Sequence, residues 1–125
     1  MTRSEAIYQF FNRLVPYKDG FIEFYPATGV PSDVQFPYGT YENIAGDLND
    51  INTMTVNLYF YTSSEKTADD AAEVVFNALS GGVVLRFDGG YVWLTRGTPF
   101  SQGVPNEEIN IKQRYILLNR NDFIN

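Results

Sequence analysis

A chain of 125 residues is sized for one hydrophobic core, and we expect residues 1–125 to form a single domain. Nine Lys and Arg face fifteen Asp and Glu, for a net charge of −6. Such a chain has few cations to displace counterions from phosphates, which argues against a nucleic-acid-binding module. Cysteine and histidine are absent, which excludes disulfides, thiolate chemistry, Ser-His-Asp arrangements and the usual zinc ligands.

No apolar run approaches the roughly 18 residues needed to span a bilayer. The first residues lead into an amphipathic stretch rather than the apolar segment of a signal peptide. We therefore expect a soluble, cytosolic protein that does not contact a membrane.

Aromatic residues make up 16% of the chain, with ten Phe, nine Tyr and one Trp. Tyrosine is enriched at protein interfaces because it combines a large rigid area with a polar tip. The composition gives a modest preference to an interface over a purely internal role for these rings.

The first element is predicted to be a helix, because apolar residues recur on one face of a 3.6-residue period: Ile7, Phe10, Phe11 and Leu14. Thr2 and Glu5 have the spacing of a capping box. Pro16 restricts the backbone of the residue before it, so the helix is expected to end at Val15.

Two extended segments are predicted next, at residues 21–25 and 36–42. Pro37 lacks an amide donor, so the second segment is expected at a sheet edge or at the start of a strand. The polar stretch 46–52 is expected to be a loop.

The clearest strand prediction covers residues 53–62. Its side chains alternate strictly, with Met54, Val56, Leu58 and Phe60 on one face and Thr55, Asn57, Tyr59 and Tyr61 on the other. Such alternation indicates a sheet with one face in the core and the other in water or against a partner.

A second helix is predicted after this strand, with Thr67 as its cap and Gly81 as its stop. Its buried stripe is expected to consist of Ala71, Val74, Val75, Ala78 and Leu79. The mixture of small and larger residues suits close packing across a sheet.

A hairpin is predicted where residues 83–87 and 91–95 flank a Gly-rich turn. Residues 97–108 are expected to form a long polar loop. A last strand is predicted at 109–118, with Ile109, Ile111, Tyr115 and Leu117 on one face and Lys112, Arg114 and Ile116 on the other. Residues 119–125 are expected to be a short tail.

The predicted element order is helix, three strands, helix, hairpin and strand. Strands dominate and most connections are short. We therefore expect an α+β fold with a mainly antiparallel β-sheet and both helices packed on one face.

Catalytic, cofactor-binding and metal-binding residues are not expected. The acids between Asp47 and Asp50 faintly resemble a calcium loop but lack its glycine and terminal glutamate. Asp69 and Asp70 are adjacent on a helix, so they project about 100° apart and are expected to support its first turn. The protein is expected not to be an enzyme and to need no cofactor.

The element order and several strings resemble the tail-terminator, or tail-completion, proteins of long-tailed, siphovirus-like bacteriophages. These strings are FIEFYP at 21–26, FPYGTYE at 36–42, MTVNLYFYT at 54–62 and QRYILLNR at 113–120. The resemblance covers nearly the whole chain and consists of aromatic and apolar positions rather than an invariant site.

The resemblance implies a virion structural protein at the head-tail junction, assembled in the host cytoplasm. Such proteins form a homohexameric ring that caps the tail tube and joins it to the head. The implied partners are other copies of the chain, the tail-tube protein and the head-completion protein. DNA would pass through the lumen without specific binding, and no catalysis or cofactor is implied.

Six residues are candidates for a protein interface. Tyr59 and Tyr61 lie on the second face of the best strand, and Arg114 would lie near them if the final strand pairs beside it. Phe100, Glu107 and Glu108 belong to the predicted long loop, which could contact a different protein. A helix-covered sheet face and a plain surface loop remain open as the alternatives.

Other functions remain open as well. The chain could be another head-tail connector or a tail-tube assembly protein, because these share its size and strand-rich character. An acidic protein inhibitor that mimics nucleic acid would cluster its carboxylates on one face. A small hydrolase would need two carboxylates across a deep cleft.

Overall fold

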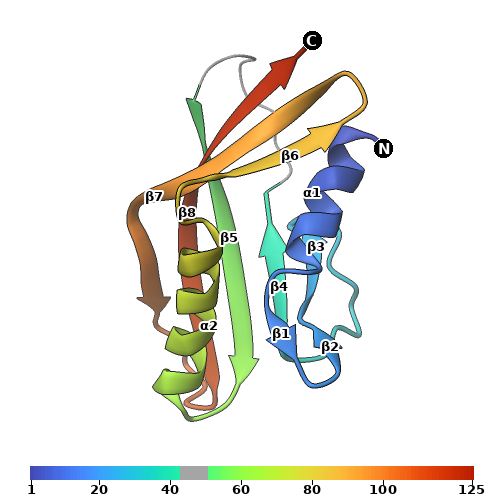
Figure 1. The fold of residues 1–125 in the computed structure, drawn as a ribbon. Coiled ribbons are helices and arrows are strands. Elements are labelled where there is room, and N and C mark those ends of the chain that lie inside the picture. The colour runs from blue at the N-terminus through green and yellow to red at the C-terminus, as the bar shows by residue number, and fades with distance from the viewer. Residues whose placement is uncertain (43–50) are drawn as a thin grey trace.

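The computed structural model describes residues 1–42 and 51–125 and has an α+β fold, as predicted (Figure 1). Six strands form one mainly antiparallel sheet in the order β3-β4-β5-β8-β7-β6, and a two-stranded ribbon, β1-β2, stands beside it. The elements are α1 (Arg3–Phe11), β1 (Pro16–Tyr17), β2 (Gly20–Phe21), β3 (Glu23–Pro26), β4 (Tyr38–Tyr41), β5 (Ile51–Tyr61), α2 (Glu65–Ala78), β6 (Val83–Phe87), β7 (Gly90–Val104) and β8 (Ile111–Ile124). No helix in the described ranges is long and apolar enough to cross a membrane.

The centre of the sheet is the antiparallel pair β5 and β8, which stay in register from Ile51–Asn121 to Tyr61–Ile111. The alternation predicted for β5 is confirmed, since Met54, Val56, Leu58 and Phe60 are all buried. Successive side chains of a strand point to opposite faces, so this register also separates the core face of β8 from its outward face.

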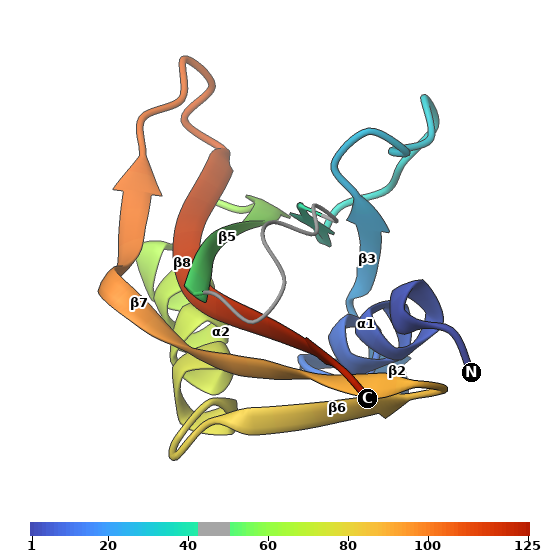
Figure 2. The ribbon, with the colours of Figure 1, turned by 90° about the horizontal axis from the view of Figure 1, so that it is seen from above.

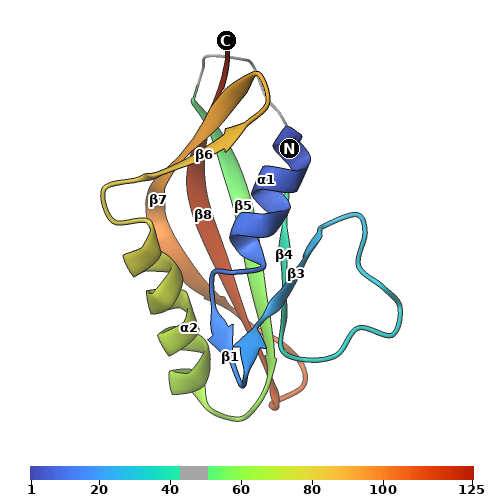
Figure 3. The same ribbon diagram turned by 45° about the vertical axis from the view of Figure 1, so that its right-hand side comes forward.

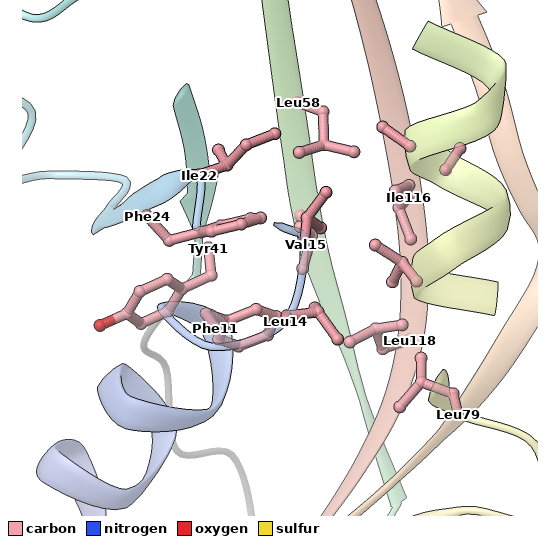
Figure 4. Packing of buried hydrophobic residues seen from close by; sticks show 14 of the residues in the cluster. Phe11, Leu14, Val15, Ile22, Phe24, Tyr41, Leu58, Leu79, Ile116 and Leu118 are labelled. Atoms are coloured by element: carbon pink, nitrogen blue, oxygen red, sulfur yellow. The ribbon is translucent and has the colours of Figure 1, made fainter. Parts of the chain in front are cut away.

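Both helices pack on the core face of the sheet. Seen from above, the sheet curls around them (Figure 2). α2 contacts β5, β7 and β8, while α1 contacts β3 and β6, the two end strands. α1 therefore fills the space between the sheet edges, and its Phe11 and the following Leu14 join the same buried cluster as Leu58 and Ile116 (Figure 4).

The first helix ends earlier than predicted, at Phe11 rather than Val15. The predicted capping box of Thr2 and Glu5 is present at its start. At its other end the Asn12 side-chain amide donates to the carbonyl of Phe24 and accepts from its amide (3.1 and 2.9 Å). Asn12 thus uses its side chain like the backbone of a neighbouring strand, and the chain leaves the helix there.

The segment around Pro37 is placed at the start of β4, one of the two predicted alternatives, but β4 is not an edge strand. It lies between β5 and β3, and it runs parallel to β3. Gly39 allows this packing, because a Cβ there would lie 2.2 Å from the ring of Phe24. The predicted loop at 46–52 is corrected at its end, where Ile51 begins β5; Asp47 to Asp50 lie outside the described residues.

The second helix begins one turn earlier than predicted. Its N-cap is Ser64, whose hydroxyl accepts from the amide of Thr67 (3.2 Å), so Thr67 is inside the helix rather than its cap. The buried stripe consists of Ala68, Ala71, Ala72 and Val75, and it continues to Leu79 after the helix. Val74 and Ala78, predicted to be buried, are exposed. Gly81 has the expected left-handed backbone, with φ of 76°.

The predicted hairpin is confirmed in β6 and β7, but the predicted loop at 97–108 is wrong. β7 continues to Val104 after an irregularity between Arg96 and Ser101, and only 105–110 connect it to β8. The predicted tail is also wrong, because β8 runs on to Ile124. β8 forms backbone hydrogen bonds with β5 on one side and with β7 on the other, and this pairing accounts for the strand at its polar residues after 118.

A buried ion cluster lies on the core face of β8. Arg120 donates to both carboxylate oxygens of Asp122 (2.7 and 2.8 Å), and Arg3 of α1 adds a third contact (3.2 Å). Arg120 is 2% exposed and Asp122 is 4% exposed. Charges this deep are stable only when paired, so the cluster ties the start of α1 to the end of the sheet.

Replacing Asp122→Ala should lower the free energy of unfolding by about 3–5 kcal/mol, because it leaves Arg120 buried without its carboxylate. The matched control is Asp70→Ala, which removes the exposed i,i+4 pair with Lys66 and should change stability far less, because water screens an exposed pair. Urea unfolding measures both variants. Equal losses would contradict the structural role given to the cluster.

Candidate protein-interaction surface

The face of the sheet away from the helices, here called the outer face, is uncharged along its two central strands. The outward residues of these fully described strands are Ile51, Thr53, Thr55, Asn57, Tyr59 and Tyr61 in β5, and Ile111, Gln113, Tyr115, Leu117, Asn119, Asn121 and Phe123 in β8. The chain has nine basic and fifteen acidic residues, so the absence of charge from these positions is selective. Depletion of charge is the compositional mark of the central part of a protein interface.

Five rings form a continuous aromatic row on the outer face: Tyr25, Phe36, Tyr38, Tyr59 and Tyr61. Tyr38 lies opposite Tyr59 in the β4-β5 ladder, and the two rings stack with centroids 4.7 Å apart. Tyr25 meets Tyr38 on one side at 6.5 Å, and Phe36 bridges Tyr38 and Tyr61 at 5.5 and 6.0 Å. Tyr61 and Phe36 are 61% and 39% exposed, so the row is accessible at its end.

Two phenols of the aromatic row, those of Tyr38 and Tyr25, have a raised pKa. Partial burial raises the pKa of Tyr38, and the neighbouring phenol of Tyr59 adds to the effect. The hydroxyl of Tyr25 donates to the Glu23 carboxylate (2.5 Å), and this bond, with burial second, raises the pKa of Tyr25 to about 12. Tyr25 and Tyr38 therefore present uncharged rings with polar tips near neutral pH.

An apolar groove of about 380 Å³ adjoins the exposed end of the aromatic row. Phe36 and Tyr61 form one wall, while Pro16 and Ile22 near the β1-β2 ribbon and Val74 of α2 contribute to the others. The apolar area thus continues from the sheet face around its end.

A second aromatic patch lies at the opposite end of the outer face. Tyr91 of β7 stacks on Phe123 of β8 with centroids 4.7 Å apart. Trp93, two residues along β7, is 41% exposed. The outer face therefore carries two separate aromatic patches joined by uncharged polar residues.

The structure places the predicted interface residues in three locations. Tyr59 and Tyr61 lie together in the aromatic row, as expected. Arg114 is not near them: Tyr59 pairs with Gln113, so Arg114 pairs with Leu58 and points to the core face. It is 5% exposed there and pairs with Asp69 (2.8 Å) and Glu65 of α2, which corrects the predicted placement.

Phe100 is not an exposed loop residue as predicted. It belongs to β7, is half-buried, and meets the ring of Phe76 in α2 edge-on with centroids 5.1 Å apart. Glu107 and Glu108 are exposed in the short connection from β7 to β8. This connection lies at the same end of the sheet as Tyr61, which pairs with Ile111.

Sequence reasoning missed Tyr25, Phe36 and Tyr38 as members of the site, because their contact with Tyr59 depends on how β3 and β4 add to β5. The uncharged outward residues of β5 and β8 left a readable signal. Every second residue from Ile51 to Tyr61 and from Ile111 to Phe123 lacks a charge.

No group of acidic residues suited to holding a metal ion occurs within 1–42 and 51–125. Comparison of the sequence with protein-family models and with curated proteins finds no match. The choice of the outer face and its aromatic row as the candidate site therefore rests on their geometry alone.

Replacing Glu23→Gln should lower the pKa of Tyr25 from about 12 toward 10.0, because the carboxylate that favours the neutral phenol is removed. The fold holds this proton more tightly than the unfolded chain does. The pair's contribution to stability is therefore full below pH 10.0 and is lost as the pH rises toward about 12. Phenolate absorbance titrations of the wild type and the variant measure the shift, and Tyr25→Phe identifies the transition. An unchanged titration would contradict the assigned hydrogen bond.

Proposed function

We propose that this chain is a virion structural protein of the tail-terminator kind, which assembles into a ring through its outer face. The observation that carries the proposal is the uncharged outer face of β5 and β8, with its partly exposed aromatic row. Both helices lie on the other face. An accessible, charge-depleted and tyrosine-rich surface of this kind is typical of a surface that other proteins cover.

The two aromatic patches support a ring rather than a two-fold dimer. A ring requires a heterologous contact, in which one patch of a subunit meets a different patch of the next. The aromatic row and the patch around Trp93 lie at opposite ends of the outer face. In such a ring, the aromatic row contacts one neighbouring subunit and the patch around Trp93 contacts the other.

The terminator role adds partners to the ring. The proposed ring is a homohexamer that caps the tail tube, contacts the tail-tube protein on one side and the head-completion protein on the other, and has no catalytic activity or cofactor. DNA passes through the lumen without specific binding. The net charge of −6 supports this, since carboxylates along a channel repel phosphates. The resemblance in element order supports the choice of a terminator over other connectors.

Purified protein should form closed rings, seen as a multiple of the 14.2 kDa chain mass in light scattering and as six-fold particles in negative stain. A tail-tube protein would instead extend into long tubes. Monomers at every concentration tested would refute self-assembly through the outer face.

Replacing Tyr61→Glu should weaken ring formation by about tenfold or more, because it places a charge in an apolar contact. Tyr61 is 61% exposed, so the subunit itself should fold and melt like the wild type. Tyr8→Glu, on the exposed side of α1 and 50% exposed, is the matched control and should assemble normally. Equal effects of the two substitutions would refute a role for the aromatic row.

A further inference from the structure

The sheet has two end strands, and the structure treats their edges differently. The edge of β3 is closed, because Asn12 occupies both the amide and the carbonyl of Phe24, and Val15 accepts from the amide of Ile22 (2.9 Å). The edge of β6 is open over its middle. An unpaired strand edge is a template for pairing with another chain.

The hairpin register identifies the open groups of β6. Phe87 pairs with Gly90 across the two-residue turn, so Phe87 and Leu85 direct their backbone groups to β7. Val84 and Arg86 alternate with them and direct their amides and carbonyls away from the sheet. Asp88, next in this outward set, donates its amide to the carbonyl of Met1 (2.8 Å). In the described parts of the chain, Val84 and Arg86 have no such backbone partner on that side.

A groove of about 470 Å³ lies along this edge and is lined by residues of β6 and α1. Figure 3 shows the ribbons of β6 and α1 side by side. Three successive β6 residues, 84–86, line it, as expected where the backbone edge rather than one face of a strand forms the wall. Phe10 and Leu14 line the opposite wall. The groove therefore has unpaired backbone groups of β6 on one side and the apolar side chains of Phe10 and Leu14 on the other.

The groove is also basic. Arg13 and Arg86 both line it. Elsewhere Arg3, Lys66, Lys112, Arg114 and Arg120 are in ion pairs. Lys18 and Arg96 instead lie over the rings of Tyr17 and Phe76. Within the structure's described ranges, neither Arg13 nor Arg86 forms an ion pair, although the chain has six more acidic than basic residues. Two unpaired cations beside an open strand edge complement a ligand with carboxylates.

We propose that this groove is a β-augmentation site for an extended acidic segment of a partner protein. The segment adds to β6 as a further strand and exchanges backbone hydrogen bonds with Val84 and Arg86. Side chains that point inward along the segment pack on Phe10 and Leu14. Its carboxylates reach Arg86 on the outer face and Arg13 at α1.

A second copy could offer only its own β6 edge, because Asn12 closes its β3 edge. Pairing of β6 with β6 would bring the like-charged Arg13 and Arg86 of both copies to one contact, which disfavours it. The occupant is therefore a different chain. The site lies outside the aromatic row and does not depend on ring assembly.

The probe is a fluorescently labelled, acetylated peptide in which glutamate alternates with valine, and its binding to the full chain is followed by fluorescence polarisation. Two control peptides separate the contribution of charge from that of the backbone hydrogen bonds. Lysine in place of glutamate reverses the charge, and backbone N-methylation removes the strand hydrogen bonds. A single-stranded DNA oligonucleotide of similar length tests a phosphate ligand.

Three protein variants accompany the wild type. Arg13→Glu combined with Arg86→Glu reverses the groove charge, and Lys18→Glu makes the same kind of change at an exposed site outside the groove. Val84→Pro removes an outward amide that the β6-β7 ladder does not use, and proline is tolerated at such edge positions. Circular dichroism and thermal melting report on folding.

The glutamate peptide should bind the wild type, and the double arginine variant and N-methylation should each weaken binding by about tenfold or more. Lys18→Glu should bind normally, and Val84→Pro should bind weakly. If Val84→Pro does not fold, the N-methylated peptide tests the same hydrogen bonds from the ligand side. Equal binding of the methylated peptide, an equal loss in Lys18→Glu, or preferential binding of DNA would each overturn the proposal. Ring mass is measured separately, so failure of ring assembly leaves this result interpretable.

Discussion

The pairing of β5 with β8 is the interaction on which the rest of the structure depends. Eleven successive residue pairs keep one register, from Ile51–Asn121 to Tyr61–Ile111. Because side chains alternate across a strand, a slip of one residue would exchange every buried position for an outward one. The same register collects the apolar core under the helices, places Arg114 beneath α2, and leaves the uncharged residues on the outer face.

The helices complete what this ladder begins. α1 contacts the end strands β3 and β6 and fills the space between them, while α2 covers β5, β8 and β7. The buried pair of Arg120 and Asp122 joins α1 to the sheet through Arg3. One face of the curled sheet is consequently committed to the core, and the helices leave the outer face and the middle of the β6 edge uncovered.

The sequence predicted those features that arise from local pattern. The alternation of β5, the capping box of α1 and the turn of the β6-β7 hairpin each depend on neighbouring residues, and all are confirmed. The division of β8 into two faces was predicted correctly, but not that the face with Arg114 is the buried one, because Arg114 and Arg120 pair with acids whose proximity no sequence pattern reveals. The segment 97–104 is polar and contains Pro99, and its strand depends on the pairing of residues 101–104 with β8, which the sequence does not reveal. The aromatic row depends on strand order, which explains why only Tyr59 and Tyr61 were anticipated.

Asn12 has a consequence for how the molecule can grow. By imitating a strand with its side-chain amide at Phe24, it leaves the sheet able to accept a new strand at one end alone. A subunit with a single open strand edge can accept only one added strand. Edge-to-edge strand addition between identical subunits would therefore stop at a pair of molecules and could not propagate into a fibril.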